Sequence, residues 1–198
     1  MRLLVVDTET GGIDPQTNSI LSVAAVVWDG ERTKSELDLA IVEPILSVTP
    51  RAMEINRINL AEHTKRAVTP AVAVKQINTF LLEHFPTEMM SKAKIALAGH
   101  NIGFDVSFLK RLYLLGGGNY DQIFSHRLLD TAGIVRFLSL AGVTPLADAG
   151  SDEAFSYFGI YVPDEDRHTA LGDVRATADL LTKLVDAGQS LGKKHFAA

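Results

Sequence analysis

The 198-residue sequence contains no cysteine, which excludes disulfide bonds, thiolate metal sites and a cysteine nucleophile. It also lacks an excess of positive charge, because 19 basic residues stand against 24 acidic ones, for a net charge of −5. A role that depends on coating polyanions through bulk positive charge is therefore disfavoured, and any contact with nucleic acid must be local. The absence of cysteine fits a reducing cytoplasm, which is the compartment that we expect.

Long apolar runs are absent as well. The longest, residues 23–28, has six residues, whereas a membrane-spanning helix needs about 18 or more. Near the N-terminus, four apolar residues separate Arg2 from Asp7, which are too few for the core of a signal peptide. We therefore expect no association with a membrane. Hydrophobic residues make up 46% of the chain and charged residues 22%, which is typical of a folded domain.

The apolar pattern predicts strands alternating with helices. Residues 3–6, 20–28 and 33–42 predict three strands that form an antiparallel meander, and short strands are predicted at 95–98 and 123–129. Helices are predicted from residue 49 onwards and at 70–85, 106–115, 131–140, 151–158 and 171–185. The order of these elements predicts one α/β domain over residues 1–187, with helices packed on a mixed sheet. We expect a loosely held tail at 188–198.

Acidic residues fall at the ends of these predicted elements. Asp7 and Glu9 lie two positions apart at the end of the first strand, so their side chains project to the same side. Asp105 lies at or just before a helix start, whereas His168 precedes the last helix and Asp173 lies in its first turn. Each acid alone is equally well explained as a turn former or a helix cap. Together they would repel one another unless cations bind between them, which is typical of an active site.

Three segments resemble, in order and spacing, the exonuclease motifs of the DEDDh exonucleases, which include the proofreading epsilon subunit of bacterial DNA polymerase III, ribonuclease T and oligoribonuclease. The segments are Val-Asp7-Thr-Glu9-Thr-Gly-Gly, Gly-His-Asn-Ile-Gly-Phe-Asp105 and His168-Thr-Ala-Leu-Gly-Asp173. The resemblance implies a ribonuclease H-like fold, in which helices flank a mixed five-stranded sheet. It also implies hydrolysis of terminal phosphodiesters of single-stranded DNA or RNA from the 3′ end, with release of nucleoside 5′-monophosphates.

Carboxylate oxygens are the ligands that hard divalent cations prefer. By this resemblance, two ions, Mg²⁺ or Mn²⁺, are bound by Asp7, Glu9, Asp105 and Asp173. His168 would then be the general base that takes a proton from the attacking water. Residues near the terminal nucleotide are predicted to bind substrate, although Phe104 is equally well explained as a core residue and His100 as a residue that fixes its loop. These predicted substrate contacts are Thr10, Gly11, Ile13, Asn56, His100 and Phe104.

The sequence departs from the family at two positions. Gly11 stands where the first motif often has threonine, which removes a hydroxyl and predicts a looser loop. Arg57 stands where the family usually has glycine in a helix on the substrate side. The second departure leaves the metal-binding acids intact and predicts a difference in the substrate groove.

Two other functions stay open at this point. Asp7-Thr-Glu9-Thr loosely resembles the start of haloacid-dehalogenase-like phosphatases, in which the first aspartate is a covalent nucleophile. That alternative leaves Asp105, His168 and Asp173 without a role. A non-catalytic module that binds nucleic-acid ends is the other alternative, and the complete set of acids argues against it. The sequence does not decide between DNA and RNA, nor between a homodimer and a polymerase partner.

Overall fold

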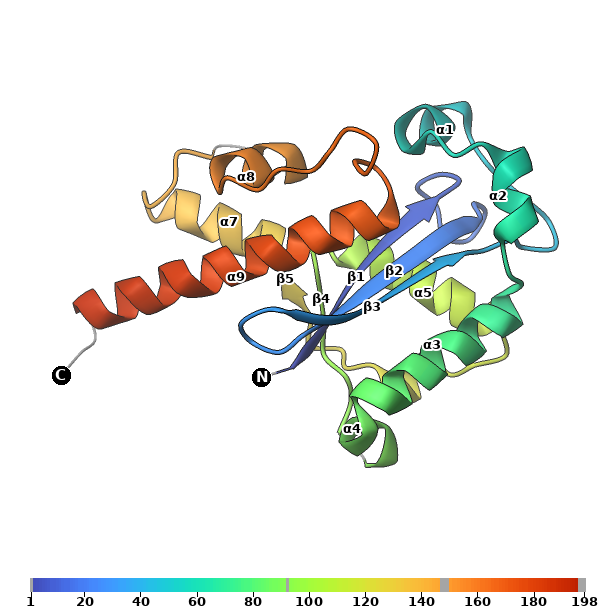
Figure 1. The fold of residues 1–198 in the computed structure, drawn as a ribbon, viewed down its shortest axis with the longest axis horizontal. Coiled ribbons are helices and arrows are strands. Elements are labelled where there is room, and N and C mark those ends of the chain that lie inside the picture. Colours follow the sequence, from blue (N-terminus) through green and yellow to red (C-terminus); the bar gives the residue numbers. More distant parts are fainter. Residues whose placement is uncertain (1, 92, 147–149, 196–198) are drawn as a thin grey trace.

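The computed structural model describes residues 2–91, 93–146 and 150–195. Its centre is a five-stranded sheet with the strand order β3-β2-β1-β4-β5 (Figure 1). The first three strands pair antiparallel, whereas β4 and β5 run parallel to β1, so the predicted mixed sheet is confirmed. The strands are β1 (Leu3–Thr10), β2 (Ile20–Trp28), β3 (Thr33–Ala40), β4 (Leu97–Gly99) and β5 (Leu129–Asp130).

Helices cover both faces of this sheet (Figure 1). One face packs against α9 (Ala170–His195), and the far side of α9 packs against α7 (Thr131–Leu140) and α8 (Ser151–Tyr157). The other face packs against α3 (Pro70–His84) and α5 (Gly103–Leu115). Four shorter helices are α1 (Pro50–Asn56), α2 (Leu60–Arg66), α4 (Pro86–Met90) and α6 (Tyr120–Ile123). In the part of the chain described, none of the helices has both the length and the apolar character needed to cross a bilayer.

Strand β1 lies in the middle of the sheet, so its side chains are buried alternately on the two faces. Val6 packs into the core beneath α3 and α5, whereas Val5 packs beneath α9. The alternation continues along the strand, so Asp7 and Glu9 project to the face that α9 covers. A register shift between Glu9 and Thr10 then interrupts the pairing with β2, as bulges often do beside functional sites.

Two of the predicted boundaries are wrong on the side of α5 and α6. Helix α5 begins at Gly103 rather than at residue 106, so Asp105 lies inside its first turn. The strand predicted at 123–129 is reduced to the two residues of β5. The start of the predicted strand is taken up by α6, which Asn119 caps by accepting a hydrogen bond from the N–H of Gln122. Phe124, directly after this helix, forms an isolated bridge with Ile95.

The last helix is longer than its pattern predicts. It continues beyond residue 185 to His195 as part of α9, because this stretch contains no proline to stop it. Residues 188–190 of this extension are exposed. Residues 196–198 of the predicted tail lie outside the described residues, so the loosely held tail stays a prediction.

Candidate active site

Three of the four predicted metal ligands converge at one end of the sheet. Asp7, Glu9 and Asp173 each offer a carboxylate oxygen, and these oxygens lie within 4.8 Å of one another. Asp7 and Glu9 come from β1, and Asp173 comes from the first turn of α9, the helix that covers the same face. The convergence therefore follows from the alternation along β1 together with the position of α9 over it.

Asp105 approaches the same strand end from α5, on the opposite face of the sheet. It is 4% exposed, and its Oδ1 accepts hydrogen bonds from the backbone N–H of Thr8 at 2.9 Å and from the Thr8 hydroxyl at 2.8 Å. Its negative charge helps to raise the pKa of Asp7. Among the described residues, however, Asp105 does not belong to the group whose oxygens lie within 4.8 Å. The structure thus places the fourth acid beside the other three rather than among them.

The clustered acids hold their protons more tightly than ordinary carboxylates. Burial raises the pKa of Asp7 well above its ordinary value, and the charges of Asp105, Glu9 and Asp173 raise it further. Burial also raises the pKa of Glu9, to about 8, and that of Asp173, where the Arg167 cation acts in the opposite direction. Asp173 Oδ1 is buried and has no hydrogen-bond partner within the described part of the chain. Crowded carboxylates with an unpaired buried oxygen fit a site for hard divalent cations.

Arg167 is a residue of this site that sequence reasoning did not identify. One of its guanidinium nitrogens, Nη1, donates to Oδ2 of Asp173. Its Nε donates to Asp152 Oδ1 at 2.7 Å and its Nη2 to Ser151 Oγ at 2.8 Å, so it joins the start of α9 to α8. The sequence contains no signal for this role beyond the position of Arg167 next to His168.

His168 lies at the edge of the acid group. Its Nδ1 is 4.0 Å from Asp173 Oδ2, and its side chain is 30% exposed. Its backbone has a φ of +62°, in the left-handed region that most residues avoid. The helix that follows is started by Thr169, whose hydroxyl accepts from the N–H of Gly172 at 3.0 Å. Partial exposure next to a carboxylate suits a side chain that exchanges protons with solvent.

A pocket of about 450 Å³ opens beside Glu9, between the end of β1, the loop after it, α1 and the start of α5. Ile13 is 87% exposed at its edge, so its side chain is free to contact a ligand in the pocket. The Phe104 ring lines the pocket and also lies 5.0 Å from the Phe108 ring, so it serves the core as well. Four of the six predicted substrate contacts line this pocket: Thr10, Ile13, Asn56 and Phe104.

Gly11 does not line the pocket, and the loop that it begins is held rather than loose. Its N–H donates to the Ser19 carbonyl at 2.7 Å, and its carbonyl accepts from the Thr49 N–H at 2.6 Å. A Cβ on Gly11 would lie 2.2 Å from the Ser47 carbonyl oxygen. The prediction of a looser loop is therefore wrong, because glycine here permits the close approach of two backbone segments.

His100 and Asn56 both make bonds that fix the surrounding structure. His100 does not line the pocket, and its Nδ1 lies 3.0 Å from the Thr131 hydroxyl. Asn56 donates from Nδ2 to the Thr10 carbonyl at 3.1 Å and accepts at Oδ1 from the Ile58 N–H at 3.1 Å. Asn56 therefore anchors the end of β1 while its side chain forms part of the pocket wall.

Arg57 ends α1 in the left-handed conformation, with a φ of +54°. Glycine adopts that conformation freely, and helices very often end on a residue of this kind. The turn that glycine would make is thus retained here with an arginine, whose side chain is exposed.

The raised pKa values predict that the metal-free protein loses stability as the pH rises. Between the ordinary pKa of 4.5 and the folded-state value of about 8, folded Glu9 keeps a proton that the unfolded chain releases. The folded state then binds more protons, so its stability falls with rising pH over that window. In EDTA, we expect the melting temperature to fall by roughly 5 °C or more between about pH 5 and about pH 9. With Mg²⁺ or Mn²⁺ present, the melting temperature should fall much less over the same pH range. A melting temperature that rises with pH in EDTA would contradict the electrostatic interpretation.

Comparisons with known proteins give matches along most of the chain. A family model described as Exonuclease matches residues 4–181. The DNA polymerase III subunit epsilon-like protein of Rhodobacter capsulatus is 31% identical over 201 residues, which cover 100% of this chain and 26% of that protein. Ribonuclease T of Wigglesworthia glossinidia brevipalpis is 26% identical, over 96% of this chain and 86% of that protein. The chain thus spans about a quarter of the first relative and most of the second.

Solved structures share the fold. Escherichia coli Exonuclease I in complex with a dT13 oligonucleotide superposes with a TM-score of 0.76 at 18% identity, over 98% of this chain and 43% of that chain. The nuclease domain of 3′hExo, a DEDDh family member bound to rAMP, superposes with a TM-score of 0.74 at 14% identity, over 94% of this chain and 92% of that chain. Together with the observed strand order, these likenesses confirm the expected ribonuclease H-like fold.

Proposed function

Because the chain belongs to the exonuclease family, we propose that it removes nucleotides from the 3′ end of single-stranded DNA or RNA. In this reaction the oxygen of a water molecule attacks the terminal phosphorus, and the bond from phosphorus to the 3′ oxygen of the preceding nucleotide breaks. The products are a nucleoside 5′-monophosphate and a chain that is one nucleotide shorter. The observation that carries this proposal is the convergence of the Asp7, Glu9 and Asp173 carboxylates within 4.8 Å.

Asp7, Glu9, Asp105 and Asp173 would hold two divalent ions, Mg²⁺ or Mn²⁺, because such ions prefer carboxylate oxygens. When bound, these ions supply an activated water and neutralise the charge that develops on the phosphate. Three of the acids lie on β1 and the first turn of α9, so rigid elements position them. The raised pKa of Glu9, about 8, supports this role, because a bound cation would take the place of the proton.

His168 would act as the general base that takes the proton from the attacking water. Its Nδ1 lies 4.0 Å from Asp173 Oδ2, so the imidazole borders the acids that would hold the ions and the attacking water. Because its side chain is 30% exposed, the proton can then pass to solvent. Neighbouring Thr169 fixes the start of α9, so the histidine is carried on a defined turn.

The terminal nucleotide would occupy the pocket beside Glu9. Ile13 and Phe104 offer apolar surfaces for the face of a base, a contact that every base can make. Thr10 and Gly12 line the same pocket as Glu9, so their backbone groups would meet the 3′-hydroxyl group, and Arg51 in the pocket wall would supply positive charge for a phosphate. The dT13 and rAMP ligands of the two solved relatives support a single-stranded end as the occupant.

The phosphatase alternative is wrong, because the chain belongs to the exonuclease family. A non-catalytic module is disfavoured by the complete set of acids and by His168 beside them. We propose further that residues 1–187 form the catalytic domain and that the protein acts in the cytoplasm, in keeping with its lack of cysteine. The epsilon-like relative supports a polymerase partner, and a homodimer is the alternative arrangement.

Single-stranded DNA and RNA oligonucleotides with a 5′ label test this function directly. With Mg²⁺ or Mn²⁺ we expect a ladder of products shortened from the 3′ end, together with free mononucleotides, and with EDTA we expect no shortening. The polymer that is shortened faster identifies the preferred nucleic acid. If the purified protein binds metal ions but shortens neither polymer, the proposal fails and the end-binding module becomes the better explanation.

A further inference from the structure

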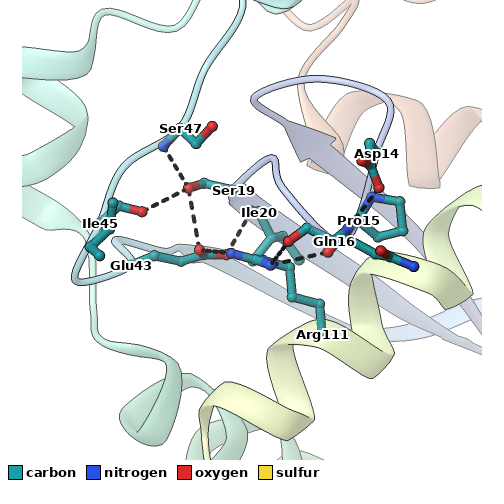
Figure 2. Close-up of polar contacts among 9 residues, drawn as sticks. All are labelled: Asp14, Pro15, Gln16, Ser19, Ile20, Glu43, Ile45, Ser47 and Arg111. Atoms are coloured by element: carbon teal, nitrogen blue, oxygen red, sulfur yellow. Dashed lines mark hydrogen bonds and ion pairs between the residues drawn. The ribbon is translucent and has the colours of Figure 1, made fainter.

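An ion pair outside the acid cluster joins three parts of the chain (Figure 2). Arg111, on α5, donates from Nε and Nη2 to the two carboxylate oxygens of Glu43, at 2.8 and 2.6 Å. Glu43 lies in the segment after β3, and its side chain is 2% exposed, against 19% for that of Arg111. A two-bond pair of this kind holds both side chains in one geometry.

The same pair holds the loop between β1 and β2. Nη1 of Arg111 donates to the carbonyls of Pro15 and Gln16, both at 3.1 Å. Oε1 of Glu43 accepts from the N–H of Ile20, the first residue of β2, at 3.0 Å. The pair therefore fixes the middle of the loop and the point at which the loop rejoins the sheet (Figure 2).

Ser19 extends these contacts from the ion pair to the pocket. Its hydroxyl lies 3.3 Å from Glu43 Oε2 and accepts from the N–H of Ser47 at 2.9 Å. Its backbone N–H donates to the Ser47 carbonyl at 2.9 Å, and its carbonyl accepts from the Gly11 N–H at 2.7 Å. A continuous series of polar contacts thus runs from Arg111 to Gly11, whose two sequence neighbours line the pocket.

A buried ion pair at this position is not required for the stability of the fold. Replacing such a pair by apolar side chains of similar volume is often neutral or stabilising. The loop is held at its ends through Gly11 and Ser19, and the hydrogen bonds of Asp14 join it to residues of the same loop. The bonds from Arg111 to the Pro15 and Gln16 carbonyls join the middle of the loop to a helix. Arg111 also lies on the helix that carries Phe104 and Asp105, so the pair joins the loop to an element that forms part of both the pocket and the acid site.

We propose that Glu43 and Arg111 are positioning residues for the terminal nucleotide. They hold the loop between β1 and β2 against α5, so that the pocket keeps its shape beside Glu9. This inference rests on the proposed exonuclease function. The pair acts on the pocket through the loop, so its loss should raise the KM for an oligonucleotide more than it lowers kcat.

Three variants separate positioning from general stability. Arg111→Met keeps the length of the stem and removes the donors, whereas Arg111→Lys keeps the charge and loses the two-bond geometry. Arg175→Met is the matched control, because Arg175 makes a similar two-bond pair with Glu36, at 2.9 and 2.5 Å, between α9 and β3. We expect Arg111→Met to raise KM about tenfold while kcat changes less than about threefold. Arg111→Lys should be intermediate, and Arg175→Met should leave both constants unchanged.

The rate of amide hydrogen exchange measures how firmly the loop is held, independently of activity. The amides of residues 12–14 and 16–18 should exchange at least about tenfold faster in Arg111→Met than in the wild type, while those in the centre of β1 stay protected. Unchanged loop exchange overturns the proposal, and so does faster exchange with unchanged KM and kcat. If Arg111→Met does not fold, Arg111→Lys provides the same comparison. If the wild type shortens no oligonucleotide, the exonuclease function fails separately, and loop exchange still decides whether the pair holds the loop.

Discussion

Replacing Asp7 by asparagine should lower the turnover number for oligonucleotide shortening by at least about 10³-fold. Asp7 lies at the electrostatic centre of the cluster, since its pKa is raised by burial and then by the charges of Asp105, Glu9 and Asp173. Asparagine has nearly the same size but offers no negative oxygen to a cation. Binding of divalent ions should therefore weaken, while the strand that carries residue 7 keeps its packing.

Asp186→Asn is the matched control for this variant. Asp186 lies on α9, the helix that carries Asp173, but it is exposed and lies about three and a half turns further along that helix. Its replacement should leave activity unchanged. Calorimetric titration with Mn²⁺ and rates of shortening measured in parallel would compare the variants. An Asp7→Asn protein that keeps its turnover within about tenfold would show that Asp7 is not an essential metal ligand.

The variant His168→Asn should lower kcat by about 10²-fold to 10⁴-fold while the affinity for divalent ions stays the same. Asparagine is chosen because residue 168 has a φ of +62°, a conformation that asparagine tolerates better than alanine does. The turn into α9 should then keep its path. A loss of activity could then be attributed to the missing imidazole rather than to a displacement of α9.

Added imidazole should restore part of the activity of His168→Asn, which a purely structural role would not allow. His126 is exposed and distant in sequence from the motifs, so His126→Asn serves as the control and should retain full activity. Weaker metal binding by His168→Asn, or no response to imidazole, would argue that the histidine shapes the site instead of moving a proton.

Much of the fold could be predicted because its signals are local. The continuous apolar runs of β1 and β2, and Thr49 before Pro50 at the start of α1, depend on neighbours within a few residues. The strand predicted at 123–129 failed because β5 pairs with β4 over two residues only. That pairing depends on where the intervening helix places the chain, which an apolar pattern does not encode.

The site could be predicted only as far as its motifs reach. The acids and His168 lie in short motifs that can be recognised from neighbouring residues. Glu43 and Arg111, by contrast, are single charged residues 68 positions apart, and their ion pair forms only in the folded chain. Arg167 likewise depends on Asp152 and Ser151 of α8, and Gly11 depends on the approach of the Ser47 backbone. Contacts of this kind depend on the folded chain, and no pattern in the sequence predicts them.

The position of α9 over β1 also sets the order in which the site is completed during translation. Asp7 and Glu9 leave the ribosome early, whereas His168 and Asp173 come from the last helix. Until α9 has emerged, the β1 face that carries Val5 has no cover, and the cluster lacks its third carboxylate. A nascent chain that lacks α9 therefore cannot bring the carboxylates of Asp7, Glu9 and Asp173 together.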